Sequence, residues 1–193
     1  MIEIIGIGGE PATGKTSLVK ELIKNLGSPR DYAHKLVKGL IFPESQAIVF
    51  GVYGGDSIFE GTDRLSMAVQ PIALNLISKM NNTASWHGWK IYFEGDRLFT
   101  GSLIQEVSTY KLPSRFYLLV ASAAEKEARH TQRKDEQTER WIKSRQTKCA
   151  NLLKQFPSVR ALENNNHQDQ ARNLRIVMEE VSTPPSRLIR DVC

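Results

Sequence analysis

The chain has 193 residues, of which 40% are hydrophobic and 24% charged, and its formal net charge is +5. This composition is ordinary for a globular protein, and no apolar run approaches the length that spans a bilayer, so we expect no membrane partner. The two cysteines, Cys149 and Cys193, predict reduced thiols rather than a disulfide framework. No secretory signal follows Met1, and the sequence therefore indicates a cytoplasmic protein.

The N-terminal segment has the pattern of a strand, a loop and a helix. An apolar run at about 2–7 predicts the strand, and apolar residues at helical spacing between about 15 and 26 predict the helix, which Gly27 closes. Between them lies Gly9-Glu10-Pro11-Ala12-Thr13-Gly14-Lys15-Thr16, which matches the phosphate-loop pattern G-x-x-x-x-G-K-[ST]. The strand–loop–helix context favours a true phosphate-binding loop over a chance match.

Each part of this loop has a chemical reason. Glycine lets the backbone N–H groups turn inward around a di- or triphosphate without an obstructing Cβ. Lys15 would place its charge on the β- and γ-phosphates, and the Thr16 hydroxyl would ligate Mg²⁺. We therefore expect ATP to be bound, with Mg²⁺, by Gly9, Glu10, Pro11, Ala12, Thr13, Gly14, Lys15, Thr16 and Ser17.

The rest of the chain continues to alternate between strands and helices. Pro71 is expected to open a second helical segment, and Asp96 to lie near a helix N-cap. The order predicts an α/β, three-layer fold in one domain over 1–193, with a mostly parallel sheet and helices on both faces. A tail from about 182 is expected to lie on the surface or fray. Further strands are predicted at 37–42, 46–53, 90–94, 115–121 and 159–162, and helices at about 64–80, 97–109, 123–155 (one or two) and 168–181.

Two carboxylates follow the predicted strand at 90–94. Because the carboxyl ends of parallel strands share one edge, Glu94 and Asp96 are expected beside the phosphate loop, where carboxylates commonly hold Mg²⁺. We therefore expect Thr16, Glu94 and Asp96 as metal ligands, with Asp96 also catalytic or, alternatively, only a helix cap. Arg97 is expected to point toward the phosphates, a surface salt bridge being the alternative.

A second acidic segment follows the predicted strand at 46–53. It contains Asp56, Asp63 and Arg64, and a carboxylate here would accept or orient the proton of an acceptor hydroxyl. Asp63 is preferred, with Arg64 beside it, because Asp56 lies between glycines and would also suit a turn. An N-cap role for Asp63 is the alternative.

The segment at about 123–150 is rich in Lys and Arg and predicts a helical lid. Arg129 and Arg133 are four residues apart and share a helix face, from which they would stabilise the charge on a phosphoryl group in transfer. A solvated helix pair is the alternative. After the last predicted strand, Asn165 is expected to contact the adenine, although a plain turn would also fit.

The order of these motifs resembles that of nucleoside- and nucleotide-kinase-type P-loop kinases over about residues 1–181. Within that group the chain is most similar to the bacteriophage kinases that phosphorylate 5-hydroxymethyldeoxyuridine within DNA. The Ala12 position, where many such loops carry glycine, is expected to matter little. The resemblance rests on Gly9–Thr16, Gly61-Thr62-Asp63-Arg64-Leu65-Ser66-Met67-Ala68-Val69-Gln70-Pro71, Phe93-Glu94-Gly95-Asp96-Arg97-Leu98 and Lys143-Ser144-Arg145-Gln146-Thr147-Lys148.

This resemblance implies a kinase that transfers the ATP γ-phosphate to the hydroxymethyl group of 5-hydroxymethyluracil in DNA, in the host cytoplasm if a phage encodes it. The excess of basic residues suits such a polyanionic partner. A flipped base would need an aromatic-lined pocket, for which Tyr53, Phe59, Trp86, Trp89 and Phe99 are candidates. A kinase of small nucleosides or nucleotides stays open as an alternative. An ATPase switch is disfavoured, because no strand of four apolar residues ends in Asp-Glu.

Overall fold

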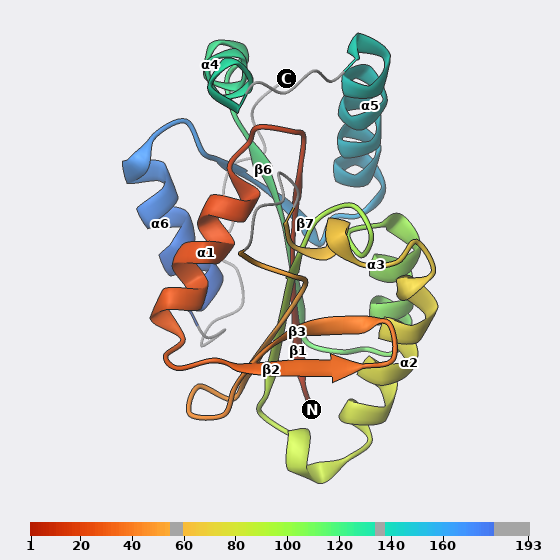
Figure 1. Cartoon of the computed structure of the whole chain (residues 1–193). Helices are drawn as coiled ribbons and strands as arrows, with labels where there is room; N and C mark the ends of the chain where they lie inside the picture. The colour runs from red at the N-terminus through yellow and green to blue at the C-terminus, as the bar shows by residue number, and fades with distance from the viewer. Residues whose placement is uncertain (55–59, 134–137, 180–193) are drawn as a thin grey trace.

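The computed structural model describes residues 1–54, 60–133 and 138–179 and places a seven-stranded sheet between two groups of helices (Figure 1). The strands run across the sheet in the order β2-β3-β4-β5-β1-β6-β7. The elements are β1 (Glu3–Gly9), α1 (Lys15–Asn25), β2 (Arg30–His34), β3 (Val37–Phe42), β4 (Ala47–Phe50), the 3-10 helix η1 (Thr62–Arg64), α2 (Val69–Asn81), the 3-10 helix η2 (Ala84–Trp86), β5 (Lys90–Glu94), α3 (Gly101–Thr109), β6 (Ser114–Val120), α4 (Ala123–Arg133), α5 (Glu139–Gln155), β7 (Val159–Glu163) and α6 (His167–Met178).

The sheet is mostly parallel, as the alternation of strands and helices predicted. β1 pairs in parallel with β5 and β6, β5 pairs in parallel with β4, and β6 with β7. β2 and β3 form an antiparallel extension next to β4. The central strands are apolar on both faces, since helices cover each side of a parallel sheet.

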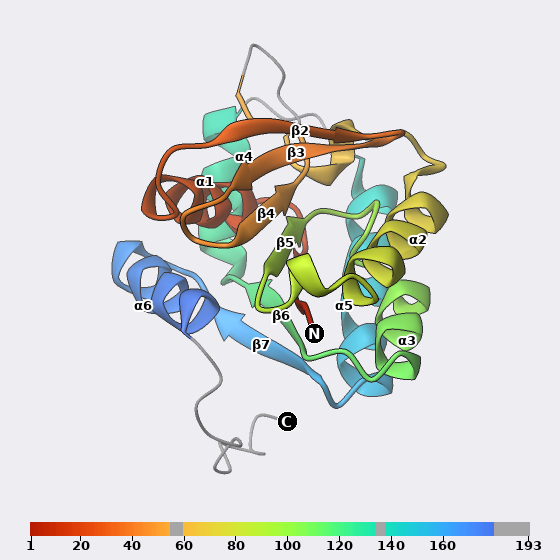
Figure 2. The same ribbon diagram turned by 90° about the horizontal axis from the view of Figure 1, so that it is seen from below.

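Two apolar clusters fill the space on the two faces of the sheet. Successive residues of β1 point to opposite sides, so that Ile4 belongs to one cluster and Ile5 to the other. Helices α2, α3 and α5 lie over the first face, and α1 and α6 over the second (Figure 2). The α/β class with helices on both faces is therefore confirmed.

Several boundaries differ from the sequence prediction. β2 was not predicted, because the segment 30–34 is polar and forms an exposed edge. Asp96 does not cap α3, which begins at Gly101 after Thr100 accepts a hydrogen bond from the backbone N–H of Leu103. Pro71 lies in the first turn of α2, which begins at Val69 and is separate from the 3-10 helix η1, so the prediction that Pro71 lies at the start of a second helical segment is confirmed to within two residues. Proline fits there because the first turn of a helix has no partner for its N–H groups.

The parallel strands all end at one edge of the sheet, which lies at the top of Figure 1. The predicted phosphate loop follows β1 at this edge, and α4 and α5 rise on either side of it. The charged segment at 123–155 forms two helices, α4 and α5, where one or two helices were predicted.

Gly8 illustrates how tightly β1 packs as it approaches the loop. A Cβ on this residue would overlap the ring of buried Phe99. We expect Gly8→Ala to lower the free energy of unfolding by about 1–3 kcal/mol, the usual effect of overpacking a core, as measured by urea denaturation. The double variant Gly8→Ala/Phe99→Leu should regain part of this loss. Equal stability of Gly8→Ala and the wild type would contradict this packing.

Candidate active site

The segment Gly9–Thr16 forms a compact loop that leads into the N-terminus of α1. Gly9 and Gly14 adopt φ angles of 143° and 87°, which L side chains rarely adopt. The Lys15 ammonium lies across the loop and donates to the carbonyl oxygens of Gly9 at 2.9 Å and Glu10 at 2.8 Å. The loop, its lysine and a helix N-terminus thus face the same region, an arrangement suited to anions.

Ala12 matters more than the sequence prediction allowed. Its φ of 60° lies in the left-handed region, where a non-glycine residue typically costs about 1–2 kcal/mol. Ala12 is also buried, and its carbonyl oxygen accepts a hydrogen bond from Arg129 Nη1 at 3.1 Å. The surrounding structure therefore maintains a strained conformation in the middle of the loop.

A buried asparagine that the sequence analysis missed attaches the loop to the end of β7. Asn164 Nδ2 donates to the carbonyl oxygen of Thr13 at 2.8 Å, and Asn173 Nδ2 lies 3.3 Å from Asn164 Oδ1. A Cβ at Gly14 would lie only 2.5 Å from Asn164 Nδ2, so Gly14 is required for this contact. The predicted Asn165 instead accepts from the backbone N–H of Ser122 at 2.8 Å, at the connection between β6 and α4.

Helix α4 contacts the loop from one side. The Arg129 guanidinium donates to the carbonyl oxygens of Ala12 and Asn164, and Lys126 Nζ pairs with Glu10 Oε2 at 2.6 Å. In this arrangement Arg129 stabilises the loop itself, so its predicted contact with the transferred group would require it to move. Arg133 is the last residue of α4, and its side chain lies outside the described part of the chain.

Glu94, at the end of β5, is the most buried of the predicted site carboxylates, with 2% of its surface exposed. It accepts a hydrogen bond from the Thr16 hydroxyl at 3.0 Å, which brings two of the three predicted metal ligands together. A Cβ at Gly61 would overlap Glu94 Oε1, so only glycine permits this approach. Burial raises the pKa of Glu94 to about 7, against the opposing charge of Lys15.

Asp63 lies beside this pair and is fixed by the turn that follows β5. Its Oδ1 accepts a hydrogen bond from the backbone N–H of Asp96 at 2.8 Å. Burial, followed by the negative charge of Asp96, raises the pKa of Asp63 above its usual value. The other candidate, Asp56, lies outside the described residues. Arg64 is exposed and donates to the carbonyl oxygen of Gly54 at 2.7 Å.

Asp96, the third predicted metal ligand, forms ion pairs with helix α5, whereas Thr16 is hydrogen-bonded to Glu94. Its two carboxylate oxygens each lie 2.8 Å from a cation of α5, Lys148 Nζ and Arg145 Nη1. The Arg145 guanidinium also lies 5.1 Å from the centre of the Trp141 ring. These contacts make Asp96 the link between the site and α5, a role that the sequence analysis did not anticipate.

Arg97 lies next to this link and is half-buried. Its charge lowers the pKa of Asp63, in opposition to the larger effect of burial. Its Nε is buried without a hydrogen-bond partner among the described residues. The predicted orientation of Arg97 toward the site is compatible with these two observations.

The donor set suits a metal that takes few protein ligands. Within the described residues, no group of three or more His, Cys, Asp or Glu side chains is placed to hold a metal by itself. Mg²⁺ in phosphoryl-transfer sites typically takes one or two protein ligands and completes its shell with water and phosphate oxygens. The hydroxyl of Thr16 and the carboxylate of Glu94 fit this requirement.

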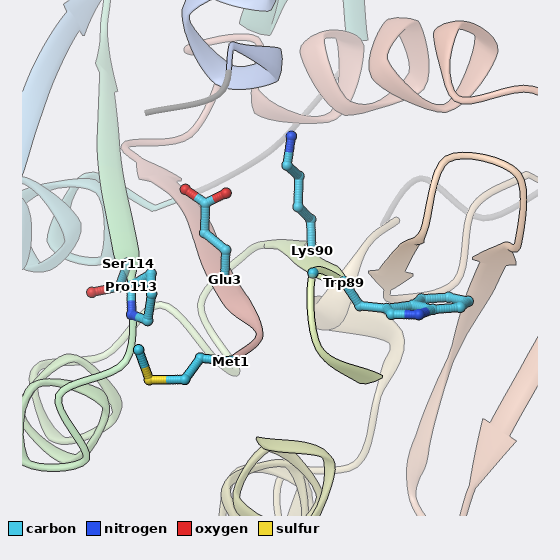
Figure 3. A pocket seen from close by; sticks show the side chains of 7 residues that line it. Met1, Glu3, Trp89, Lys90, Pro113 and Ser114 are labelled. Atoms are coloured by element: carbon cyan, nitrogen blue, oxygen red, sulfur yellow. The ribbon is translucent and has the colours of Figure 1, made fainter. Parts of the chain in front are cut away.

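Not all aromatic candidates lie near this edge. Trp86 and Trp89 pack against each other with ring centres 4.7 Å apart at the opposite edge, where Trp89 lines a pocket of about 410 Å³ (Figure 3). Phe99 is buried in the core, and Phe59 lies outside the described residues. Tyr53 lies near the site, close enough for the charge of Glu94 to act on its hydroxyl. Burial, and then the charge of Glu94, raise the pKa of this hydroxyl well above the usual value.

The chain matches no protein-family model, and a search of curated protein sequences finds no match. In the ranges that the structure describes, no helix is long and apolar enough to cross a bilayer.

The raised pKa of Glu94 predicts a pH-dependent stability. Because the folded state binds this proton more tightly, the ligand-free protein should lose stability as pH rises from about 4.5 to 7, by up to about 3 kcal/mol. Glu94→Gln retains an acceptor for Thr16 without the charge. We expect it to raise the free energy of unfolding at pH 8 by roughly 2–3 kcal/mol, with little change at pH 4.5.

Urea denaturation of both proteins without Mg²⁺, at several pH values, measures this difference. A Glu94→Gln protein that is less stable than the wild type at pH 8 would show that the Glu94 carboxylate is not destabilised by burial.

Proposed function

We propose that the protein is a P-loop kinase that transfers the γ-phosphate of ATP to a hydroxyl group. The observation that supports this most strongly is the hydrogen bond of Thr16 to Glu94, beside Lys15 and Asp63. This group combines a cation for phosphate, a hydroxyl–carboxylate pair for a metal and a second carboxylate for the acceptor. Simple nucleotide binding would not require the second carboxylate.

The donor half of the site consists of the loop and Glu94. Lys15 now contacts carbonyl oxygens of Gly9 and Glu10, and phosphate oxygens would offer its ammonium a stronger, charged partner. Thr16 and Glu94 would hold Mg²⁺, which neutralises charge on the β- and γ-phosphates. The Asn164 and Arg129 contacts keep the loop in its phosphate-binding shape.

The acceptor half consists of Asp63 and the cations beside Asp96. The carboxylate of Asp63 would accept the proton of the attacking hydroxyl, and its raised pKa makes it a better base than an exposed aspartate. Because the Asp96 N–H fixes one oxygen of Asp63, the other oxygen is available to the acceptor. Lys148 and Arg145 form ion pairs with Asp96 and would stabilise negative charge on the phosphoryl group during its transfer.

For the acceptor, we propose the hydroxymethyl group of 5-hydroxymethyluracil in DNA. The resemblance of Gly61–Pro71 and Phe93–Leu98 to phage DNA-base kinases supports this acceptor, and so does the net charge of +5. A base inside a duplex would have to be flipped out to reach Asp63. The product would be a phosphorylated base, ready for further modification.

A transfer assay separates this proposal from its alternatives. The protein is incubated with Mg²⁺ and γ-labelled ATP and is offered 5-hydroxymethyluracil-containing DNA, a panel of free nucleosides and nucleotides, or no acceptor. Label in DNA supports the proposal, label in a mononucleoside or mononucleotide supports a small-molecule kinase, and release of free phosphate alone supports an ATPase. Transfer that survives Lys15→Ala would contradict the assignment of the loop.

Asp63→Asn tests the proposed proton acceptor. We expect kcat to fall by about 10²–10⁴-fold, the usual contribution of general base catalysis, while the dissociation constant for ATP changes less than about threefold. Steady-state transfer at saturating substrates measures kcat, and calorimetric titration measures the dissociation constant for ATP.

The matched control is Asp31→Asn, an exposed aspartate on the edge strand β2, which should leave both quantities unchanged. Full activity of Asp63→Asn would exclude Asp63 as the base.

A further inference from the structure

Helix α5 carries an unusual concentration of positive charge. It contains five Lys or Arg residues and one acidic residue, Glu139 at its first position, so its net charge is +4. The formal net charge of the whole chain is +5. The rest of the chain is therefore nearly balanced, and this helix dominates the attraction of the protein for polyanions.

The cations of α5 divide between two faces. Arg145 and Lys148 pair with Asp96, on the same side of the helix as Cys149 and Leu152, which are buried in the core. The other three cations are exposed and share a stripe about 100° wide with three small polar residues, at 3.6 residues per turn. The members of this outer face are Arg140, Lys143, Ser144, Thr147, Asn151 and Lys154.

The outer face has the length and chemistry to contact several phosphates. Arg140 and Lys154 are separated by about 21 Å along the helix at ~1.5 Å per residue. One strand of duplex DNA advances ~3.4 Å per phosphate, so the face extends past about six of them. Within the part of the chain that the structure describes, no acidic side chain forms an ion pair with Arg140, Lys143 or Lys154.

We propose that this outer face binds the phosphodiester backbone of the double-stranded DNA that carries the acceptor base, an inference that rests on the proposed function. The opposite side of the same helix contacts Asp96, so a bound strand would run about one helix diameter, ~10 Å, from the site. The face would supply affinity for DNA, while Asp63 and Lys15 would supply the chemistry. An acidic protein is the competing occupant.

The test compares two triple variants of the full chain. One is Arg140→Gln/Lys143→Gln/Lys154→Gln. The matched control, Lys24→Gln/Lys79→Gln/Lys111→Gln, removes the same charge from exposed positions near the opposite edge of the sheet. Fluorescence anisotropy of a labelled 20-base-pair duplex with 5-hydroxymethyluracil measures affinity between 50 and 200 mM KCl. Thermal unfolding verifies that both variants are folded.

We expect the α5 variant to reduce the slope of log affinity against log salt by about 3, since each lost phosphate contact removes about 0.9. Its KM for the duplex should rise at least tenfold, while kcat at saturating DNA and affinity for ATP stay unchanged. The KM for a trinucleotide acceptor, too short to follow the helix, should also stay unchanged. The control variant should retain the wild-type slope to within about 1.

An unchanged salt slope in the α5 variant, or an equal loss in the control, would overturn the proposed surface. An equal rise of KM for the trinucleotide would also overturn it, because the face would then act on the site itself. The anisotropy measurement does not require phosphoryl transfer. If DNA binding requires the outer face of α5 but no label from ATP enters the DNA, the result supports the proposed surface and counts against the proposed acceptor.

Discussion

The hydrogen bond from Thr16 to Glu94 is the interaction on which the rest of the site depends. It joins the first turn of α1 to the end of β5 and so fixes the predicted phosphate loop against the sheet. This hydrogen bond requires glycine at position 61, because a Cβ there would overlap the Glu94 carboxylate. It also requires that β5 end with Glu94 in a buried position. Burial there raises the pKa of Glu94 to about 7, so the ligand-free fold is destabilised by the very carboxylate that the proposed metal needs. The strain of Ala12 and the burial of Glu94 are thus the structural costs of a site prepared for charge.

The two helices of the predicted lid contact different halves of the site. Helix α4 attaches to the loop through Lys126 and Arg129, and α5 attaches to Asp96 through Arg145 and Lys148. Asp96 in turn fixes Asp63 through its backbone N–H. A shift of α4 would therefore act on the proposed donor side, whereas a shift of α5 would act on the proposed acceptor side. The proposed DNA surface on α5 places substrate binding on the helix that reaches the acceptor side.

The sequence predicted those parts of the fold that depend on local patterns. The loop, the strand before it and the mostly parallel sheet follow from glycine spacing and apolar periodicity, and the structure confirms the α/β class. The missed elements depend on tertiary contacts. β2 has too few apolar residues to be read as a strand, and it forms because it pairs with β3. Asn164, Asn165 and Asn166 are chemically identical, and only the register of β7 decides which one reaches Thr13. The ion pairs of Asp96 likewise require the placement of α5, some 50 residues away.

The central claim is that the loop binds a triphosphate and that Thr16 and Glu94 hold its Mg²⁺. Calorimetric titration of ATP with and without Mg²⁺, on the wild type and on Thr16→Val, tests it most directly. Valine has nearly the shape of threonine but no hydroxyl. We predict that Mg²⁺ strengthens ATP binding to the wild type at least tenfold, about 1.4 kcal/mol, and that Thr16→Val loses most of this gain while binding metal-free ATP as before. A wild type that does not bind ATP, or a Thr16→Val protein that keeps the full effect of Mg²⁺, would contradict the account.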